Sequence, residues 1–266
     1  MKKFVLTDET KILINGTAPR RIRAATDFAL ANGEKVKSGD PGGFIEKEEN
    51  LSHGGSAWIY GNAAVYDNAR VYGDAKVRCS AHVYRHARIY GSARIYDNVR
   101  AYGEARIHGK ADVYHNALVY DSAEIYGYAR VFGDAQVFGD ARIYDNARVD
   151  DNSQIHGNAW VYGNASIYGD ARIYDNAQVY GYAKIGGDAY IKGPFDYAVF
   201  DNPWDGGQVL TYTRSNKMWK IGFFHGTGDE LVAKAYKDGE MFGKCYEAIV
   251  RAQEAIDIAV EKGQAE

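Results

Sequence analysis

The sequence predicts an all-β solenoid, in which short strands stack into coils, and three observations support this. An aliphatic residue recurs every six positions from Ile59 to Ile191 without an insertion, and 22 of these 23 places hold Val or Ile. Apolar and polar residues alternate around each place, which is the period-two pattern of a strand. Between the strands stand Gly or Asp and then Asn or Asp, which favour turns. Such short strands bury their apolar faces only against neighbouring rungs, so the fixed period excludes a helical bundle.

Residues 1–52 are predicted to form an N-terminal β cap. The stretch "FVLTDETKILINGTAPRRIRAATDF" contains a hairpin that turns at Asn15-Gly16. The following stretch "SGDPGGFIEKEENLS" is predicted to be a loop. A cover is expected here because an open solenoid end exposes strand edges and apolar rungs.

Residues 53–196 are predicted to form the solenoid. A further hexad, "HGGSAW" from His53, extends the register and brings the count to 24 hexads. One aliphatic place holds the small residue Ala101, and close to it a place that usually holds Ala contains the larger Val99. Four places after each aliphatic residue stands Ala in 20 of 23 hexads, but Val99 occurs near Ala101. This exchange of a large and a small residue preserves volume, as a close-packed interior requires.

Residues 197–266 are predicted to form a small C-terminal α+β domain that covers the other end. Three strands are expected at 197–202, 208–214 and 217–225, with turns at Asp205-Gly206-Gly207 and Ser215-Asn216. Thr227 and Glu230 form a capping-box pattern that starts a helix, and residues 240–263 form a second, amphipathic helix.

The repeated phrase "[VI]-Y-G-[DN]-A-R" resembles the hexapeptide repeat of left-handed parallel β-helices. This resemblance implies a left-handed parallel β-helix of about eight triangular coils, with three hexads in each coil. The stretches "FVLTDET", "AATDF", "VKSGDPGGFIEKEENLS" and "AWIYGNA" are also similar to YdcK-type hexapeptide-repeat proteins and to uncharacterised phage and prophage proteins. Members of this group are often labelled acetyltransferases on the strength of the repeat.

No catalytic residue, metal site or cofactor is predicted. The resemblance to hexapeptide acyltransferases implies a histidine base and an insertion loop, but residues 59–196 contain no insertion, and no histidine has a carboxylate at a spacing that indicates a catalytic pair. The histidines of the repeat are interpreted as surface substitutions: His86, His108, His115 and His156. The "RVDDN" corner at 148–152 lacks a repeated ligand pattern and is interpreted as solvated rather than calcium-binding.

Aromatic and basic residues are predicted to form columns on the outside, because residues 18 apart lie one above another. The place after the aliphatic residue is Tyr in 15 of 23 hexads, so ring columns are expected on all three faces. On one face an arginine column runs beside the rings, broken by Glu124 and ended by Trp160 and Gln178. The predicted ligand-binding or partner-binding residues of that face are Arg70, Tyr72, Arg88, Tyr90, Arg106, His108, Arg142 and Tyr144. Stacked rings can simply stabilise the ladder, or they can meet a second copy of the chain, a nucleotide, nucleic acid or glycan, or a host protein.

Net charge, the N-terminal stretch and the two cysteines indicate the compartment and the kinds of partner to expect. A formal charge of −3 gives no global attraction to nucleic acid or to a membrane, and "MKKFVLTDETK" is too polar for a signal peptide. Cys79 and Cys245 indicate a reducing compartment, so a cytoplasmic protein is expected, in the host cytoplasm if phage-encoded. We expect a non-enzymatic binding or scaffold protein, a homotrimer, which inhibits or sequesters a host protein or an anionic nucleotide. The alternatives are an acetyl-CoA-dependent acyltransferase with its site between subunits and a structural phage component.

Overall fold

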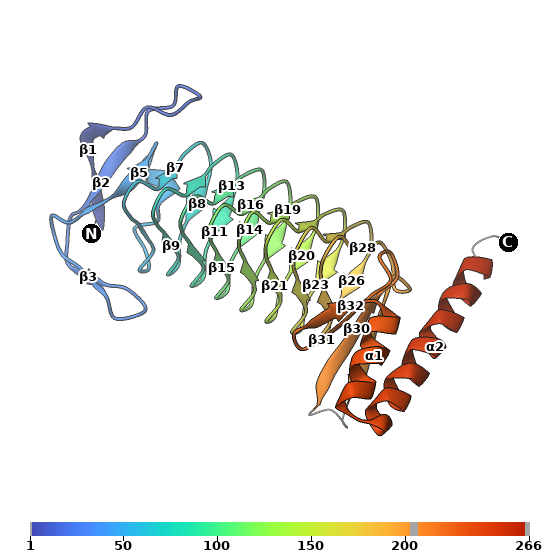
Figure 1. Ribbon diagram of the computed structural model, residues 1–266. Coiled ribbons are helices and arrows are strands. Elements are labelled where there is room, and N and C mark those ends of the chain that lie inside the picture. Colours follow the sequence, from blue (N-terminus) through green and yellow to red (C-terminus); the bar gives the residue numbers. More distant parts are fainter. Residues whose placement is uncertain (1, 203–206, 264–266) are drawn as a thin grey trace.

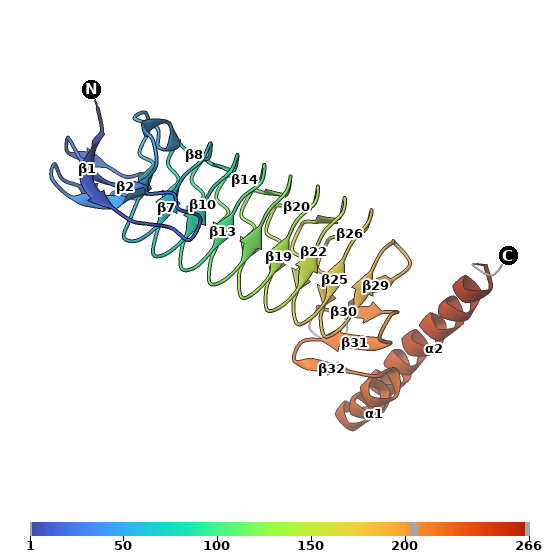
Figure 2. The same cartoon turned by 90° about the horizontal axis from the view of Figure 1, so that it is seen from above.

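The chain forms an elongated stack of coils between an N-terminal group of strands and a C-terminal group of strands and helices (Figure 1). The computed structural model describes residues 2–202 and 207–263. Figure 2 shows the same stack turned by 90°, with α1 and α2 at the end opposite to β1 and β2. The predicted solenoid of about eight coils, with a small C-terminal region of sheet and helix, is confirmed.

Between residues 58 and 191, all of which are described, one two-residue strand occurs every six residues, and these strands form three parallel sheets. The first sheet contains β7 (Ala64–Val65), β10 (His82–Val83), β13 (Arg100–Ala101), β16 (Leu118–Val119), β19 (Gln136–Val137), β22 (Gln154–Ile155), β25 (Arg172–Ile173) and β28 (Tyr190–Ile191). The second contains β8 (Arg70–Val71), β11 (Arg88–Ile89), β14 (Arg106–Ile107), β17 (Glu124–Ile125), β20 (Arg142–Ile143), β23 (Trp160–Val161) and β26 (Gln178–Val179). The third contains β6 (Trp58–Ile59), β9 (Lys76–Val77), β12 (Arg94–Ile95), β15 (Asp112–Val113), β18 (Arg130–Val131), β21 (Arg148–Val149), β24 (Ser166–Ile167) and β27 (Lys184–Ile185).

The interior and the corners follow the repeat. The aliphatic places are 0% exposed. Val99 and Ala101 are both buried in the same hydrophobic core, which agrees with an exchange of volume between them. The third place of each hexad from residue 61 to residue 187 has a positive φ, which favours Gly. Where Asp replaces Gly, its carboxylate often accepts the N–H one coil later, as Asp67 Oδ2 does from Arg85 N at 3.0 Å and Asp151 Oδ2 from Gly169 N at 3.0 Å. Asp therefore offsets the strain of its backbone with a hydrogen bond between coils.

The N-terminal segment extends the first sheet beyond the repeat. As predicted, β1 (Phe4–Thr10) and β2 (Arg20–Ala24) form an antiparallel hairpin. A second hairpin, which was not predicted, is formed by β3 (Phe28–Ala29) and β4 (Lys35–Val36). The prediction of a loop over residues 38–52 was wrong in part, because β5 (Pro41–Ile45) pairs with β2 and β7 and is followed by the 3-10 helix η1 (Glu48–Asn50). Gly42 and Gly43 permit close packing rather than flexibility. A Cβ at Gly43 would lie 2.4 Å from Ile59 Cγ2 and 2.7 Å from the Ala63 carbonyl oxygen.

The register predicted for the His53 hexad was also wrong. Val71 forms a bridge with Leu51, 20 residues earlier, rather than with the residue 18 positions earlier. Leu51 is 1% exposed and takes the inward place, whereas the His53 ring stacks on Phe4 with their centroids 4.2 Å apart. The first coil is thus two residues longer at this corner, which places residues 48–53 beneath the start of the second sheet.

The C-terminal segment covers the last coil, as predicted. Strands β29 (Tyr197–Asn202), β30 (Gln208–Thr213), β31 (Met218–Ile221) and β32 (Phe224–Gly226) form an antiparallel sheet, and α1 (Gly228–Asp238) and α2 (Glu240–Gly263) follow. Side-chain hydroxyls replace the next rung, because Ser215 Oγ accepts from Tyr190 N at 2.7 Å and Thr211 Oγ1 accepts from Lys184 N at 3.1 Å.

Of four further details of this segment, one differs from the prediction, two are confirmed and one lies partly outside the described residues. The strand predicted at 217–225 is divided into two by a turn at Gly222. The predicted turn at Ser215-Asn216 and the Thr227 capping box are confirmed. In the predicted Asp205-Gly206-Gly207 turn, the first two residues lie outside the described residues. Neither helix, over the residues described, is long and apolar enough to cross a membrane.

Candidate functional site

The predicted binding residues lie together on the outer side of the second sheet. We call this surface, made of Arg70, Tyr72, Arg88, Tyr90, Arg106, His108, Arg142 and Tyr144, the Arg/Tyr face. The arginines are exposed and occupy the first residue of their strands, and the rings follow two residues later and are partly buried. The strands pair in register, so each side chain stands above the equivalent one of the preceding coil.

The rings of this face stack flat on one another. From Tyr72 to Tyr180 the ring centroids are 4.6 to 5.3 Å apart, and His108 fills its place between Tyr90 and Tyr126. Because each inner ring has a ring on both sides, a ligand could meet only the edges and hydroxyls of these rings. Stacking of a planar ligand is possible only at the two ends of the column. Stacked columns also occur on the other two faces, as predicted.

The hydroxyls of Tyr90, Tyr126 and Tyr144 in the ring column are neutral donors at physiological pH. Partial burial is the largest cause that raises the pKa of Tyr90, Tyr126 and Tyr144 above the usual tyrosine value. Neighbouring groups act in the same direction, among them Tyr72 on Tyr90 and Glu124 on Tyr126. The face therefore presents cations and neutral O–H groups, both of which suit an anion.

Three arginines of the face stand on consecutive rungs, and none of them forms an ion pair with a residue that the structure describes. Arg88 pairs in register with Arg70 on one side and with Arg106 on the other. Among the described residues, none of the three has a hydrogen bond or an ion pair with a carboxylate. Like charges placed directly opposite each other on adjacent strands destabilise a sheet. Further along, Glu124 interrupts the column, and its Oε2 lies 3.9 Å from Arg142 Nε.

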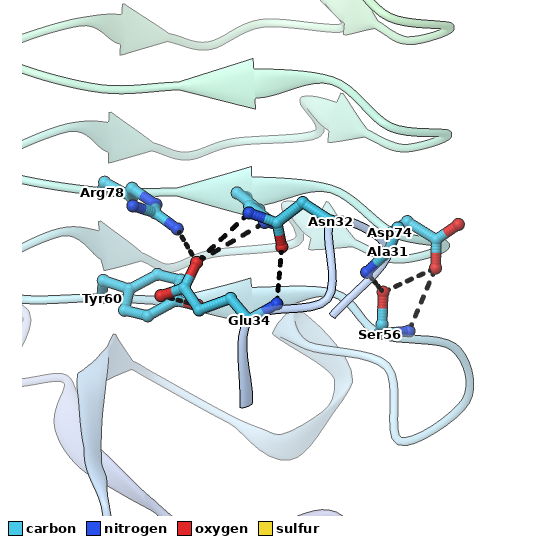
Figure 3. Close-up of polar contacts among 8 residues, drawn as sticks. Ala31, Asn32, Glu34, Ser56, Tyr60, Asp74 and Arg78 are labelled. Carbon is cyan, nitrogen blue, oxygen red and sulfur yellow. Dashed lines mark hydrogen bonds and ion pairs between the residues drawn. The ribbon is translucent and has the colours of Figure 1, made fainter. Parts of the chain in front are cut away.

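On the third sheet and in the first coils, several basic residues form ion pairs within the chain. On the third sheet, Arg94 forms two hydrogen bonds of 2.6 Å with Asp112, and Arg148 Nε lies 2.9 Å from Asp150 Oδ2. In the first coils the β3–β4 hairpin supplies the acid, because Glu34 Oε2 accepts from Arg78 Nη2 at 2.7 Å (Figure 3). Figure 3 also shows Tyr60 and Asn32 beside this carboxylate and Ser56 joined to Asp74.

The pKa of Glu34 reflects its pairing with Arg78. Although burial acts in the opposite direction, the hydrogen bond and the charge of Arg78 lower the pKa of Glu34. Lys76 Nζ lies 3.7 Å from the same carboxylate. Arg100 and Arg172 of the first sheet also lack an ion pair within the described chain, but their rung neighbours are His82, Leu118, Gln154 and Tyr190. What distinguishes the Arg/Tyr face is that three arginines without an ion pair to any described residue stand on consecutive rungs.

Two histidines have carboxylate neighbours that the spacing along the sequence did not indicate. His108 Nε2 lies 3.1 Å from Glu124 Oε1, and His53 Nε2 lies 3.6 Å from Glu48 Oε2. The first pair joins adjacent coils diagonally, at a separation of 16 residues, and a search for pairs close along the chain misses it. The interpretation of "RVDDN" as a solvated corner was wrong for Asp150, which is 9% exposed, whereas Asp151 is exposed.

A depression of about 650 Å³ lies at the N-terminal end of the Arg/Tyr face. Three predicted residues line it, namely Arg70, Tyr72 and Arg88. Besides the buried Val71, the rest of the lining was missed by the sequence reasoning: Glu48, Glu49, Leu51, Ser52 and His53. The two-residue shift of the first coil brings this segment beneath β8, and an unbroken 18-residue register could not indicate it. Volumes of this size accommodate small organic ligands.

Comparison with known proteins supports a likeness at the level of the repeat. A family model described as the YdcK beta solenoid repeat matches residues 141–157 and 165–181. The chain is thus similar to the YdcK solenoid family over these two stretches, which agrees with the resemblance predicted for the repeat, whereas the resemblance of the N-terminal stretches stays a prediction. No curated protein matches the chain. Among the described residues there is no group of three or more His, Cys, Asp or Glu side chains placed to hold a metal ion.

Proposed function

We propose that the chain is a non-enzymatic binding protein that holds an anionic partner on its Arg/Tyr face. The observation that carries this proposal is the in-register column Arg70, Arg88 and Arg106, in which no arginine forms an ion pair with a carboxylate of the described chain, although Glu124 is the next rung after Arg106. Guanidinium groups bind phosphate and carboxylate groups through paired, charge-assisted hydrogen bonds. An anion that bridges adjacent rungs would remove the repulsion between them.

A charge-matched pair of variants tests this proposal. Arg88→Glu with Arg106→Glu reverses the column, whereas Arg130→Glu with Arg172→Glu makes the same change of net charge on the other two sheets. We expect the wild type and the second variant to capture the same protein or small molecule from a cell lysate, identified by mass spectrometry, and the first variant to lose it. Equal capture by both folded variants would exclude the face as the binding surface.

The proposed assembly is a homotrimer in the cytoplasm, with the terminal segments covering the solenoid and adding contacts. Tyr and Arg are enriched at protein interfaces, and the ring columns present rigid surfaces for such contacts. Both cysteines are free thiols, which suits a reducing compartment. Light scattering should give three times the mass of the chain, and a monomer at micromolar concentration would contradict the trimer.

The biological version of this proposal is a phage-encoded inhibitor that sequesters a host protein or an anionic nucleotide. It is supported by the resemblance to phage and prophage proteins and by the unneutralised arginines. Its partner should be recovered from a lysate of the bacterial host and should compete with added phosphate compounds for the face.

An acyltransferase is the second candidate, and the contact between His108 and Glu124 favours it. A histidine oriented by a carboxylate is a typical general base. If this function holds, acetyl-CoA should bind in calorimetry, and His108→Ala should abolish acyl transfer while Glu124→Gln weakens it. Absence of acetyl-CoA binding would exclude this candidate.

A further inference from the structure

The ring column of the Arg/Tyr face has a free end in the depression described above. Tyr72 stacks on Tyr90 at 4.9 Å and, among the described residues, has no other ring contact. Leu51 forms the bridge with Val71, so the small residue Ser52 takes the place beneath Tyr72 where other rungs have a ring. The face of the Tyr72 ring opposite Tyr90 is therefore open to a planar group.

Two unpaired cations border the same space. Arg70 and Arg88 line the depression and lie on adjacent rungs, with no acidic partner among the residues that the structure describes. Their spacing allows both guanidinium groups to reach one phosphate, whose oxygens accept hydrogen bonds in several directions. The open ring and the cations thus offer two different kinds of contact within one volume.

The two acidic residues of the lining, Glu48 and Glu49, differ in whether they are already paired with another residue. Glu48 is already paired, since Lys2 Nζ donates to its Oε1 at 2.7 Å, and this hydrogen bond is the main cause that lowers the pKa of Glu48. His53 Nδ1 accepts from Lys3 N at 3.1 Å, so a neutral ring carries its proton on Nε2, toward Glu48. Glu49 is exposed and remains available to accept hydrogen bonds from hydroxyl or amino groups of a ligand.

We propose that this depression binds a phosphorylated aromatic ligand of the size of a nucleoside monophosphate. The aromatic ring stacks on the free face of Tyr72, the phosphate bridges Arg70 and Arg88, and Glu49 accepts from a hydroxyl or amino group between them. This inference rests on the proposed function, because it uses two arginines of the same column. It goes further in that it requires a ring as well as a negative charge.

Calorimetry on the full chain with simple probes tests the two requirements separately. AMP and UMP carry both parts, ribose 5-phosphate and inorganic phosphate carry only the anion, and adenosine carries only the ring. We expect the two nucleotides to bind about 10-fold or more tightly than any single-part probe, given what a stacked base usually contributes. Equal affinities for AMP and ribose 5-phosphate would overturn the stacking on Tyr72.

Variants assign the contacts to these residues. Tyr72→Ala and Arg70→Gln should each weaken AMP binding about 10-fold or more. The matched control is Tyr174→Ala, which removes the terminal ring of the column on the first sheet and should leave AMP affinity unchanged. Circular dichroism confirms that each variant is folded. Equal losses in Tyr72→Ala and Tyr174→Ala would overturn the site.

Failure of this inference is distinguishable from failure of the proposed function. If AMP and UMP do not bind but the column variant Arg88→Glu with Arg106→Glu still loses an anionic partner, the depression is not a nucleotide site and the face remains a binding surface. If neither AMP nor any anion binds in a manner that depends on Arg88, both proposals are wrong.

Discussion

Reversing one charge in the arginine column should stabilise the free protein, because the column is unfavourable without its partner. In Arg88→Glu, two like-charged cross-strand pairs, with Arg70 and Arg106, become two pairs of opposite charge. Each such pair is worth roughly 0.2 to 1 kcal/mol, and exposed pairs lie at the low end because water screens them. Removing two repulsions and adding two attractions at the low end gives a gain of about 1 kcal/mol in the free energy of unfolding.

Urea titration at low and high salt measures this effect. The midpoint of Arg88→Glu should rise at low salt, and the rise should shrink in about 1 M salt, where the screening length falls to about 3 Å. Arg172→Glu is the control, because its rung neighbours Gln154 and Tyr190 carry no charge, and its midpoint should not rise. A lower midpoint for Arg88→Glu, or a rise that salt does not reduce, would refute the claim that the column is strained by its own charge.

Three further predictions concern the solenoid. Gly43→Ala should destabilise the protein by about 1 to 3 kcal/mol in thermal unfolding, because its Cβ has no space, whereas Gly54→Ala, with its nearest neighbour at 3.6 Å, should change little. Val99→Ala and Ala101→Val should each cost roughly 1 to 3 kcal/mol, but the double variant should recover most of the loss in urea midpoints; additive losses would contradict the volume exchange. Burial raises the pKa of Asp150, so its ionised form opposes folding, and this penalty disappears as the pH falls below the raised pKa. Asp150→Phe should therefore raise the melting temperature more at pH 7 than at pH 4, and an equal rise at both would contradict this reasoning.

Sequence periodicity carried the prediction of the solenoid because one physical requirement repeats at every rung. Each aliphatic residue must face inward on a two-residue strand, and each corner needs a left-handed conformation, so the pattern from Ile59 to Ile191 specifies both. The C-terminal helices followed from local signals, since the Thr227–Glu230 capping box acts within one turn. Predictions of this kind depend only on neighbours in the chain or on the fixed period.

The features that sequence reasoning missed depend on contacts that the period does not describe. Gly42 and Gly43 look like a flexible loop, but they are required where β5 packs closely against Ile22 and Ile59. In the shifted first coil, Leu51 rather than His53 fills the inward place, and the His53 ring packs on Phe4 outside the repeat.

The candidate site, too, has features that the sequence period predicts and features that depend on contacts between distant residues. The columns and their residues could be placed from the 18-residue spacing alone. Which arginines remain unpaired depends on side-chain reach, on the β3–β4 hairpin that supplies Glu34 to Arg78, and on diagonal contacts such as that between Glu124 and His108. The depression beneath Tyr72 exists only because of the shifted coil.

The most direct test of the central claim is the affinity of the purified chain for inorganic polyphosphate, measured by calorimetry at low and at physiological salt. Binding should weaken steeply with salt, should be lost in Arg88→Glu with Arg106→Glu, and should persist in Arg130→Glu with Arg172→Glu. Binding that survives in the first variant, or that is lost equally in both, would show that the arginine column does not hold the anionic partner.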